Sequence, residues 1–159
     1  MANKKVTATQ NDELFVLQTG LISESTKKII EIRDFSKKIE DPENNHKEIV
    51  SPTFKLAGGE FSIIVIPDCI RFNEPGFIGV ALFNQSKEEQ LASATFKVAP
   101  FRETGNCEMK KLQAGQAAGW YNFLPQVRYR KGAKVHGDVL QLEVVMTLHR
   151  KADGDGWTR

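Results

Sequence analysis

Residues 57–67, with the sequence AGGEFSIIVIP, indicate the fold more strongly than any other stretch of the chain. Residues 61–66 are almost continuously apolar and rich in aromatic and β-branched side chains, which favours a strand buried on both faces. The glycines before them suit a tight turn, and Pro67 ends the strand because it lacks a backbone donor. The stretch therefore predicts a turn followed by a buried strand.

Similar segments recur along the chain and are separated by turn residues. Residues 28–33 are β-branched, residues 77–83 are apolar, and residues 139–148 alternate between apolar and polar side chains. Weaker extended patterns lie at residues 49–56 and 92–98. No amphipathic helix of ordinary length is expected between these segments, so the pattern predicts an all-β, antiparallel β-sandwich.

The core of this sandwich is expected to come from apolar residues at strand positions. These are Phe54, Phe61, Ile63, Val65, Leu82, Phe96, Leu140, Leu142 and Val144.

The segments between the strands are expected to be irregular. Residues 37–47 are charged and include a proline, which predicts a loop. Residues 99–119 are rich in Gly, Ala and Gln, and we expect a loop with a short helix near residues 109–113. Residues 125–131 fit either a short helix or a strand, and residues 131–138 supply turn residues.

The length of 159 residues is typical of one domain. We expect an N-terminal extension at residues 1–25, the sandwich at residues 26–150 and a flexible tail at residues 151–159. The start of the chain is basic but has no apolar segment behind it, which argues against a signal peptide.

The composition indicates a globular protein of nearly balanced charge. The chain carries 22 basic and 20 acidic residues, a net charge of +2, which predicts neither a nucleic-acid nor a membrane partner. No apolar run is long enough to span a bilayer. Two cysteines without a framework spacing suit free thiols in a reducing compartment, so we expect the cytoplasm, with the nucleus as the alternative.

No residue pattern points to catalysis, a metal or a cofactor. The three histidines (His46, His136 and His149) lack the short spacings of metal ligands. Cys107 follows a short Gly-containing segment, but no known nucleophile signature surrounds it. The tetrapeptide at residues 58–61, GGEF, is similar to the diguanylate cyclase signature but is one residue short, and its place between two strands favours a tight turn. We therefore expect that the chain is not an enzyme.

One constellation combines aromatic and basic side chains. Trp120, Tyr121 and Phe123 precede a basic stretch that includes Arg128 and Arg130. Interleaved aromatic and basic residues can bind single-stranded nucleic acid, and rigid amphipathic rings can equally line a peptide groove. A third interpretation is a solvated basic segment beside aromatic core residues.

Six short segments in a fixed order carry a family resemblance. They are IRDFS at 32–36, SPTF at 51–54 followed by Gly58 and Gly59, FSIIVIP at 61–67, FIGVALF at 77–83, GWYNFL at 119–124 and GDVL with its continuation at 137–145. In this order they resemble the MATH domain, also called the TRAF-C or meprin-and-TRAF-homology domain, over about residues 26–149. The resemblance implies an eight-stranded antiparallel β-sandwich that binds other proteins.

Several positions depart from the family pattern. Two tryptophans common in the family correspond to Ile30 and Phe61, which keep an apolar side chain. The family's Trp-Gly-Phe segment falls on residues 118–120, with Ala118 first and Trp120 last. Neighbouring aromatic positions fall on Ala81 and Ala94. The resemblance therefore implies a peptide groove of different chemistry.

We expect a protein-interaction module that binds a short extended peptide of a partner, in an adaptor or substrate-recruitment role. The expected peptide-binding residues are Phe83, Trp120, Tyr121, Phe123, Arg128 and Arg130, and the arginines favour an acidic ligand. The alternative is a structural or self-assembling β-sandwich without a peptide groove. The sequence does not indicate an oligomeric state.

Overall fold

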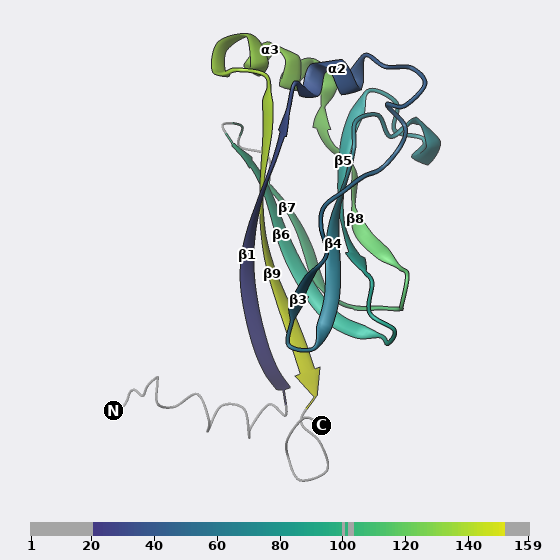
Figure 1. Ribbon diagram of the computed structural model, residues 1–159, viewed down its shortest axis with the longest axis vertical. Helices are drawn as coiled ribbons and strands as arrows, with labels where there is room; N and C mark the ends of the chain where they lie inside the picture. Colours follow the sequence, from purple (N-terminus) through teal and green to yellow (C-terminus); the bar gives the residue numbers. More distant parts are fainter. Residues whose placement is uncertain (1–20, 100, 102–103, 152–159) are drawn as a thin grey trace, which may run out of the picture.

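The computed structural model describes residues 21–99, 101 and 104–151, and these form two packed β-sheets with two helices at one end (Figure 1). In chain order the elements are β1 (Leu21–Arg33), α2 (Phe35–Ile39), β2 (Ile49–Val50), β3 (Phe54–Leu56), β4 (Gly59–Ile66), the 3-10 helix η2 (Ile70–Phe72), β5 (Phe77–Asn84), β6 (Gln90–Ala99), β7 (Thr104–Leu112), β8 (Ala117–Pro125), α3 (Gln126–His136) and β9 (Val139–Lys151). Within this described part, no helix is long and apolar enough to cross a membrane.

The strands form two antiparallel sheets that face each other. One sheet has the order β1-β9-β6-β7, and the other has the order β2-β4-β5-β8, with β3 also paired to β4. Every pairing is antiparallel. The longest pairing joins β1 to β9 from Leu21 opposite Lys151 to Arg33 opposite Val139. The predicted all-β, antiparallel sandwich is confirmed.

A bulge at Ser51 divides one edge strand into β2 and β3. Val50 lies opposite Ile64 and Phe54 lies opposite Phe61, so the edge strand has one more residue than β4 between these pairs. The Ile63 N–H donates to Ser51 Oγ at 2.8 Å, and the Ser51 N–H donates to the Ile63 carbonyl at 2.8 Å. Pro52, which has no N–H, occupies the bulge. Counting β2 and β3 as one interrupted strand gives the eight strands expected.

The β3–β4 hairpin contains the turn that the sequence predicts. Ala57 and Gly58 connect the strands with φ values of 50° and 85°. Positive φ at both central residues is the conformation that matches the twist of a two-residue hairpin. The GGEF tetrapeptide is therefore a hairpin turn leading into β4.

The core lies between the inner faces of the two sheets. Eight of the nine core residues expected from the sequence are buried, and Phe54 is half-buried against Phe61. Phe61 itself is fully buried. These expectations are confirmed because strand periodicity alone decides which side chains face inward.

The end of the sandwich is closed by α2 and α3, which meet at Asp138. Its carboxylate accepts hydrogen bonds from the Ser36 N–H and hydroxyl at 3.0 Å and from the Tyr129 hydroxyl at 2.8 Å. The Phe35 and Tyr129 rings pack edge to face at 5.2 Å. Burial alone would raise the pKa of Asp138, but the hydrogen bonds from Tyr129 and Ser36 hold it below its ordinary value.

Several expectations for the connecting segments are wrong. Residues 99–119 contain strand β7 and the first three residues of β8 instead of a long loop with a helix, because pairing with β6 and β5 overrides a composition poor in strand formers. The expected loop at 37–47 begins inside α2, whose buried Phe35 and Ile39 hold it against the core. Residues 126–136 are helix α3, which settles the open alternative at 125–131 and replaces most of the turn expected at 131–138.

The limits of the sandwich differ slightly from the expected ones. Strand β1 begins at Leu21, so residues 21–25 belong to the sandwich and not to an extension. Strand β9 ends at Lys151, and the remainder of the expected tail, residues 152–159, lies outside the described residues.

We expect Phe61→Ala to lower the free energy of unfolding by about 3–5 kcal/mol, because it leaves a large cavity in a fully buried site. Chemical denaturation measures the loss. Val135→Ala, at an exposed position of α3, is the control and should change stability by less than about 0.5 kcal/mol. A loss below about 1 kcal/mol for Phe61→Ala would contradict the described register.

We expect stability to fall at acidic pH partly through Asp138. Because its folded-state pKa is lower than the unfolded value of about 3.9, its stabilisation is present above about pH 4. It is lost as the pH falls through the folded-state pKa. Asp138→Asn should lower stability at neutral pH and flatten the acidic part of the stability curve, measured by denaturation at several pH values. Glu31→Gln is the exposed control, and parallel curves for Asp138→Asn and the unmodified chain would refute this role.

Candidate functional site

One long side of the sandwich is bordered by two edge strands. Strand β7 is the last strand of its sheet, and β8 is the last strand of the other. Between them lies a groove of about 500 Å³ lined by Thr104, Gly105, Asn106, Glu108, Trp120, Asn122 and Phe123. The groove is thus formed by two strands that the sequence did not predict.

Gly105 allows Trp120 to lie against the backbone of β7. A Cβ at this position would be 2.5 Å from the indole ring and 3.0 Å from the Phe123 ring, which is too close. Trp120 remains 39% exposed, whereas Phe123 is 8% exposed and packs edge to face against Phe96. Trp120 is therefore the large apolar surface that the groove offers to a ligand.

A bulge in β8 sets the direction of its aromatic side chains. Val80 pairs with Trp120 and Ile78 pairs with Leu124, so three residues of β8 lie opposite Gly79 alone. A side chain at Gly79 would collide with the Cys69 sulfur, so this position requires glycine. The bulge lets Trp120 and Phe123 line the same groove although they are three residues apart.

Tyr121 lies on the opposite, outer face of the same sheet. It packs, together with Phe83, against a second apolar cluster that includes Ile64, Ile66 and Cys69. Its ring stacks on the exposed Phe72 of η2, with centroids 3.9 Å apart and planes at 4°. These side chains form a second apolar surface that does not open into the groove.

The six residues expected to bind peptide therefore occupy three places. Trp120 and Phe123 line the β7–β8 groove, Phe83 and Tyr121 lie on the outer face, and Arg128 and Arg130 lie on α3. Arg128 is exposed and Arg130 is half-buried.

Sequence reasoning missed the β7 side of the groove and the aromatic Phe72. Gly105, Asn106 and Glu108 lie in a stretch whose composition resembles a loop, and β7 has no clear alternation of buried and exposed residues. Phe72 lies at the end of η2, in a stretch of sequence rich in turn residues. An apolar side chain within such a stretch was the signal available for Phe72, whereas no comparable signal marks Gly105.

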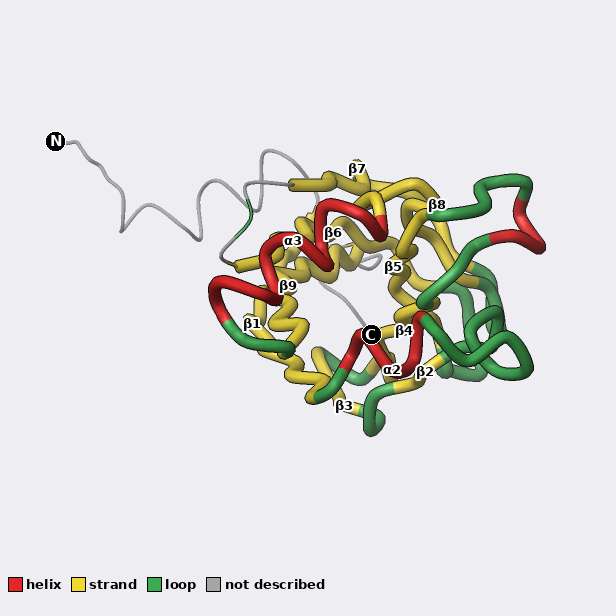
Figure 2. The backbone as a smooth tube through the Cα atoms, turned by 90° about the horizontal axis from the view of Figure 1, so that it is seen from above, coloured by secondary structure: helices red, strands yellow, loops and turns green. Residues whose placement is uncertain are grey.

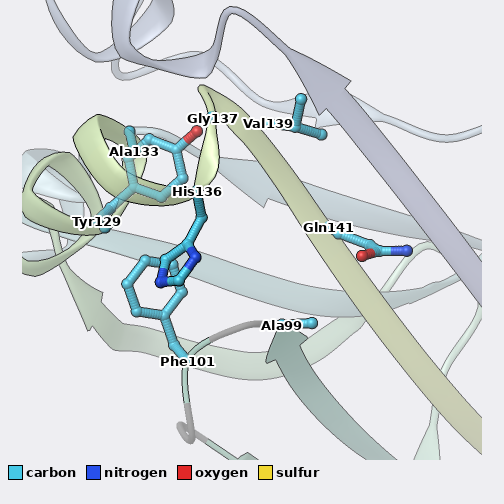
Figure 3. Close-up of a pocket in the computed structure, with 9 residues that line it drawn as sticks. Ala99, Phe101, Tyr129, Ala133, His136, Gly137, Val139 and Gln141 are labelled. Atoms are coloured by element: carbon cyan, nitrogen blue, oxygen red, sulfur yellow. The ribbon is translucent and has the colours of Figure 1, made fainter.

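A smaller pocket of about 230 Å³ lies between α3 and the neighbouring sheet (Figure 3). Phe101, His136 and Gln141 are among its lining residues, and Figure 3 shows Val139 and Gln141 on strand β9. The Tyr129 hydroxyl at this pocket already donates to Asp138. The pocket therefore offers mainly an imidazole and an amide, and no activated nucleophile faces it.

The two thiols are poorly suited to nucleophilic chemistry. Burial raises the pKa of Cys69 to about 12, and burial also raises the pKa of Cys107. Both sulfurs are therefore protonated near neutral pH, whereas a thiolate is the reactive form.

One histidine makes side-chain hydrogen bonds to two serines. His149 hydrogen-bonds through its two ring nitrogens to Ser23 Oγ at 2.9 Å and Ser93 Oγ at 3.3 Å. Among the residues that the structure describes, no group of three His, Cys, Asp or Glu side chains is arranged to hold a metal ion.

Comparison with known proteins identifies the fold. No protein-family model matches the chain, and no curated protein matches its sequence. Among solved structures it is similar to a TRAF5 chain from Notothenia coriiceps, with a TM-score of 0.50 and 15% sequence identity, over 86% of this chain and 79% of that chain. The chain therefore has a TRAF-like β-sandwich fold.

We expect Gly105→Ala to displace the Trp120 ring because the added Cβ collides with it. The indole should move toward solvent and its fluorescence emission should shift to longer wavelength. The measurement uses a Trp157→Phe background, which leaves Trp120 as the reporter. Met109→Ala, which is exposed on the same strand and is not among the residues lining the groove, is the control. Unchanged emission from Gly105→Ala would contradict the described contact.

Proposed function

We propose that this chain is an interaction module that binds a short extended segment of a partner protein in the β7–β8 groove. The exposed Trp120 ring between two edge strands is the observation that carries the proposal. The TRAF-like fold supports a role in protein interaction generally. The module would serve as an adaptor or recruit substrates, in the cytoplasm or the nucleus.

The edge strands supply backbone groups for peptide pairing. An extended segment can add to an exposed sheet edge through main-chain hydrogen bonds while side-chain pockets give specificity. Both edges are interrupted by register shifts, near Ala92–Ala94 opposite β7 and near Ile78–Val80 opposite β8. Regular pairing is thus limited to a few residues, which favours a short ligand and protects the edges against aggregation.

The groove favours an apolar or aromatic ligand side chain against Trp120. Asn106, Asn122 and Thr104 surround it with amide and hydroxyl groups that can fix a peptide backbone. Glu108 is the ionisable residue among those lining the groove, whereas Arg128 and Arg130 lie on α3. An acidic ligand would therefore meet the arginines only if it extends from the groove toward α3.

A non-catalytic role is part of this proposal. The raised pKa values of both thiols argue against a cysteine nucleophile. The TRAF-like fold supports the same view through its similarity to an interaction domain.

A structural or self-assembling role is the second candidate. It is favoured by an apolar groove of about 350 Å³ between β1 and the β2 edge, whose rim carries the exposed Ile29 and Val50. Two copies could cover this groove. Sedimentation at increasing protein concentration tests this role, and a constant monomer would exclude it.

We expect Trp120→Ala to weaken binding of the best peptide from an array screen by at least about tenfold, because a central aromatic residue dominates such an interface. Titration calorimetry measures the loss, from a Kd in the micromolar range. Tyr121→Ala, on the outer face of the same strand, is the matched control and should change affinity little. Loss of binding in Tyr121→Ala but not in Trp120→Ala would move the site to the outer face.

A further inference from the structure

The two helices form a basic end of the molecule. Helices α2 and α3 lie across the same end of the sandwich, and β1 begins and β9 ends at the opposite end (Figures 1 and 2). Neither helix contains an acidic residue. Their basic residues are Lys37, Lys38, Arg128, Arg130, Lys131 and Lys134, and all except the half-buried Arg130 are exposed.

The core contacts of α3 determine which of its residues face outward. Tyr129 is buried, and Ala133 packs against the same core. At 100° per residue, Arg128, Lys131 and Lys134 then project away from the sandwich. Two valines share this outer side, Val127 with 67% and Val135 with 76% of its surface exposed.

The charge of this end exceeds that of the whole chain. Residues 34–40 and 126–138 together carry six basic and three acidic residues, a net charge of +3, against +2 for all 159 residues. One of the three acidic groups, Asp138, is already engaged by Ser36 and Tyr129. The remaining residues carry 16 basic and 17 acidic side chains, so the excess of basic charge in the chain comes from this end.

We propose that this α2–α3 face docks on an anionic lipid membrane. Clusters of four to eight Lys and Arg residues beside a helix are attracted to anionic lipid headgroups. The face is the outer surface of helices and not a groove, since the pocket at α3 lies on the side toward the sheet (Figure 3). Val127 and Val135 can bury their side chains at the boundary between the lipid headgroups and the acyl chains. A nucleic-acid backbone has no such apolar layer.

The α2–α3 face and the β7–β8 groove have no residues in common. Strand β8 ends at Pro125 and α3 begins at the next residue, so the β7–β8 groove lies on the long side of the sandwich and reaches toward the helix end (Figure 1). The proposal is independent of peptide binding, because it uses different residues.

Vesicle co-sedimentation of the full chain tests the proposal. We expect binding to vesicles of phosphatidylcholine with phosphatidylserine, little binding to phosphatidylcholine alone, and weaker binding as sodium chloride screens the charges. Lys131→Gln combined with Lys134→Gln should lower the partition coefficient at least about tenfold, because each cation contributes substantially near the surface. Val127→Ser combined with Val135→Ser should lower it by a few-fold.

The matched control is Lys110→Gln combined with Lys111→Gln on β7, which removes the same charge from two exposed residues elsewhere. It should retain most of the binding, and circular dichroism verifies that each variant is folded. Equal losses from the two lysine pairs, or no binding to anionic vesicles at low salt, would overturn the proposal. A further outcome would also overturn the membrane proposal: tight binding to polyglutamate or an oligonucleotide, together with unchanged vesicle binding by the Val127→Ser and Val135→Ser variant. This outcome would assign the face to an acidic macromolecule.

Discussion

The arrangement of the closed end depends on the carboxylate of Asp138. Helix α2 has only five residues, and its N-cap residue Asp34 makes no capping side-chain hydrogen bond. The first turn is instead capped by Asp138, which is 102 residues away from Ser36 in the chain. Because isolated helices of this length are unstable, α2 exists only through this long-range cap and the burial of Phe35 and Ile39. Two short sequence segments that carried the family resemblance, around Ser36 and Asp138, thus meet in one interaction.

The same constraint positions α3. Tyr129 donates to Asp138 and packs against Phe35, so the helix cannot rotate about its axis without breaking both contacts. The 13-residue pairing of β1 with β9 brings the end of β1 beside the start of β9 and holds the two helices together. Which charges face the solvent at this end is therefore a consequence of the core and not of local sequence.

Strands rich in β-branched and aromatic residues are predicted correctly from the sequence. Strands rich in small residues are not. Phe61, Ile63 and Val65 are correctly assigned to the core because β-branched and aromatic side chains with a fixed period have few other uses. Gly119 and its alanine neighbours suggested a loop, yet a side chain at Gly119 would collide with the backbone of Val80 and Ala81. The small residues are present because β5 and β8 approach closely, and that reason becomes visible only once the pairing is known.

The candidate groove shows the same limit. Trp120 is conspicuous in the sequence, but its neighbour Tyr121 points to the opposite face, and the bulge against Gly79 decides where the aromatic side chains after it point. A bulge depends on two strands far apart in the sequence, so the periodicity of one strand cannot reveal it. No sequence pattern predicts the role of Gly105 either, although without this glycine the Trp120 indole could not lie against β7.

The net charge of the whole chain does not reveal the basic charge at the α2–α3 end. A balance of 22 basic and 20 acidic residues argues against an anionic partner only if the charges are mixed over the surface. The fold produces a local basic excess, because two helices without acidic residues are packed side by side at one end. Attraction at this end weakens with salt, whereas contact with the half-exposed Trp120 rests mainly on apolar burial. The two surfaces therefore differ in the force that governs them as well as in the residues that form them.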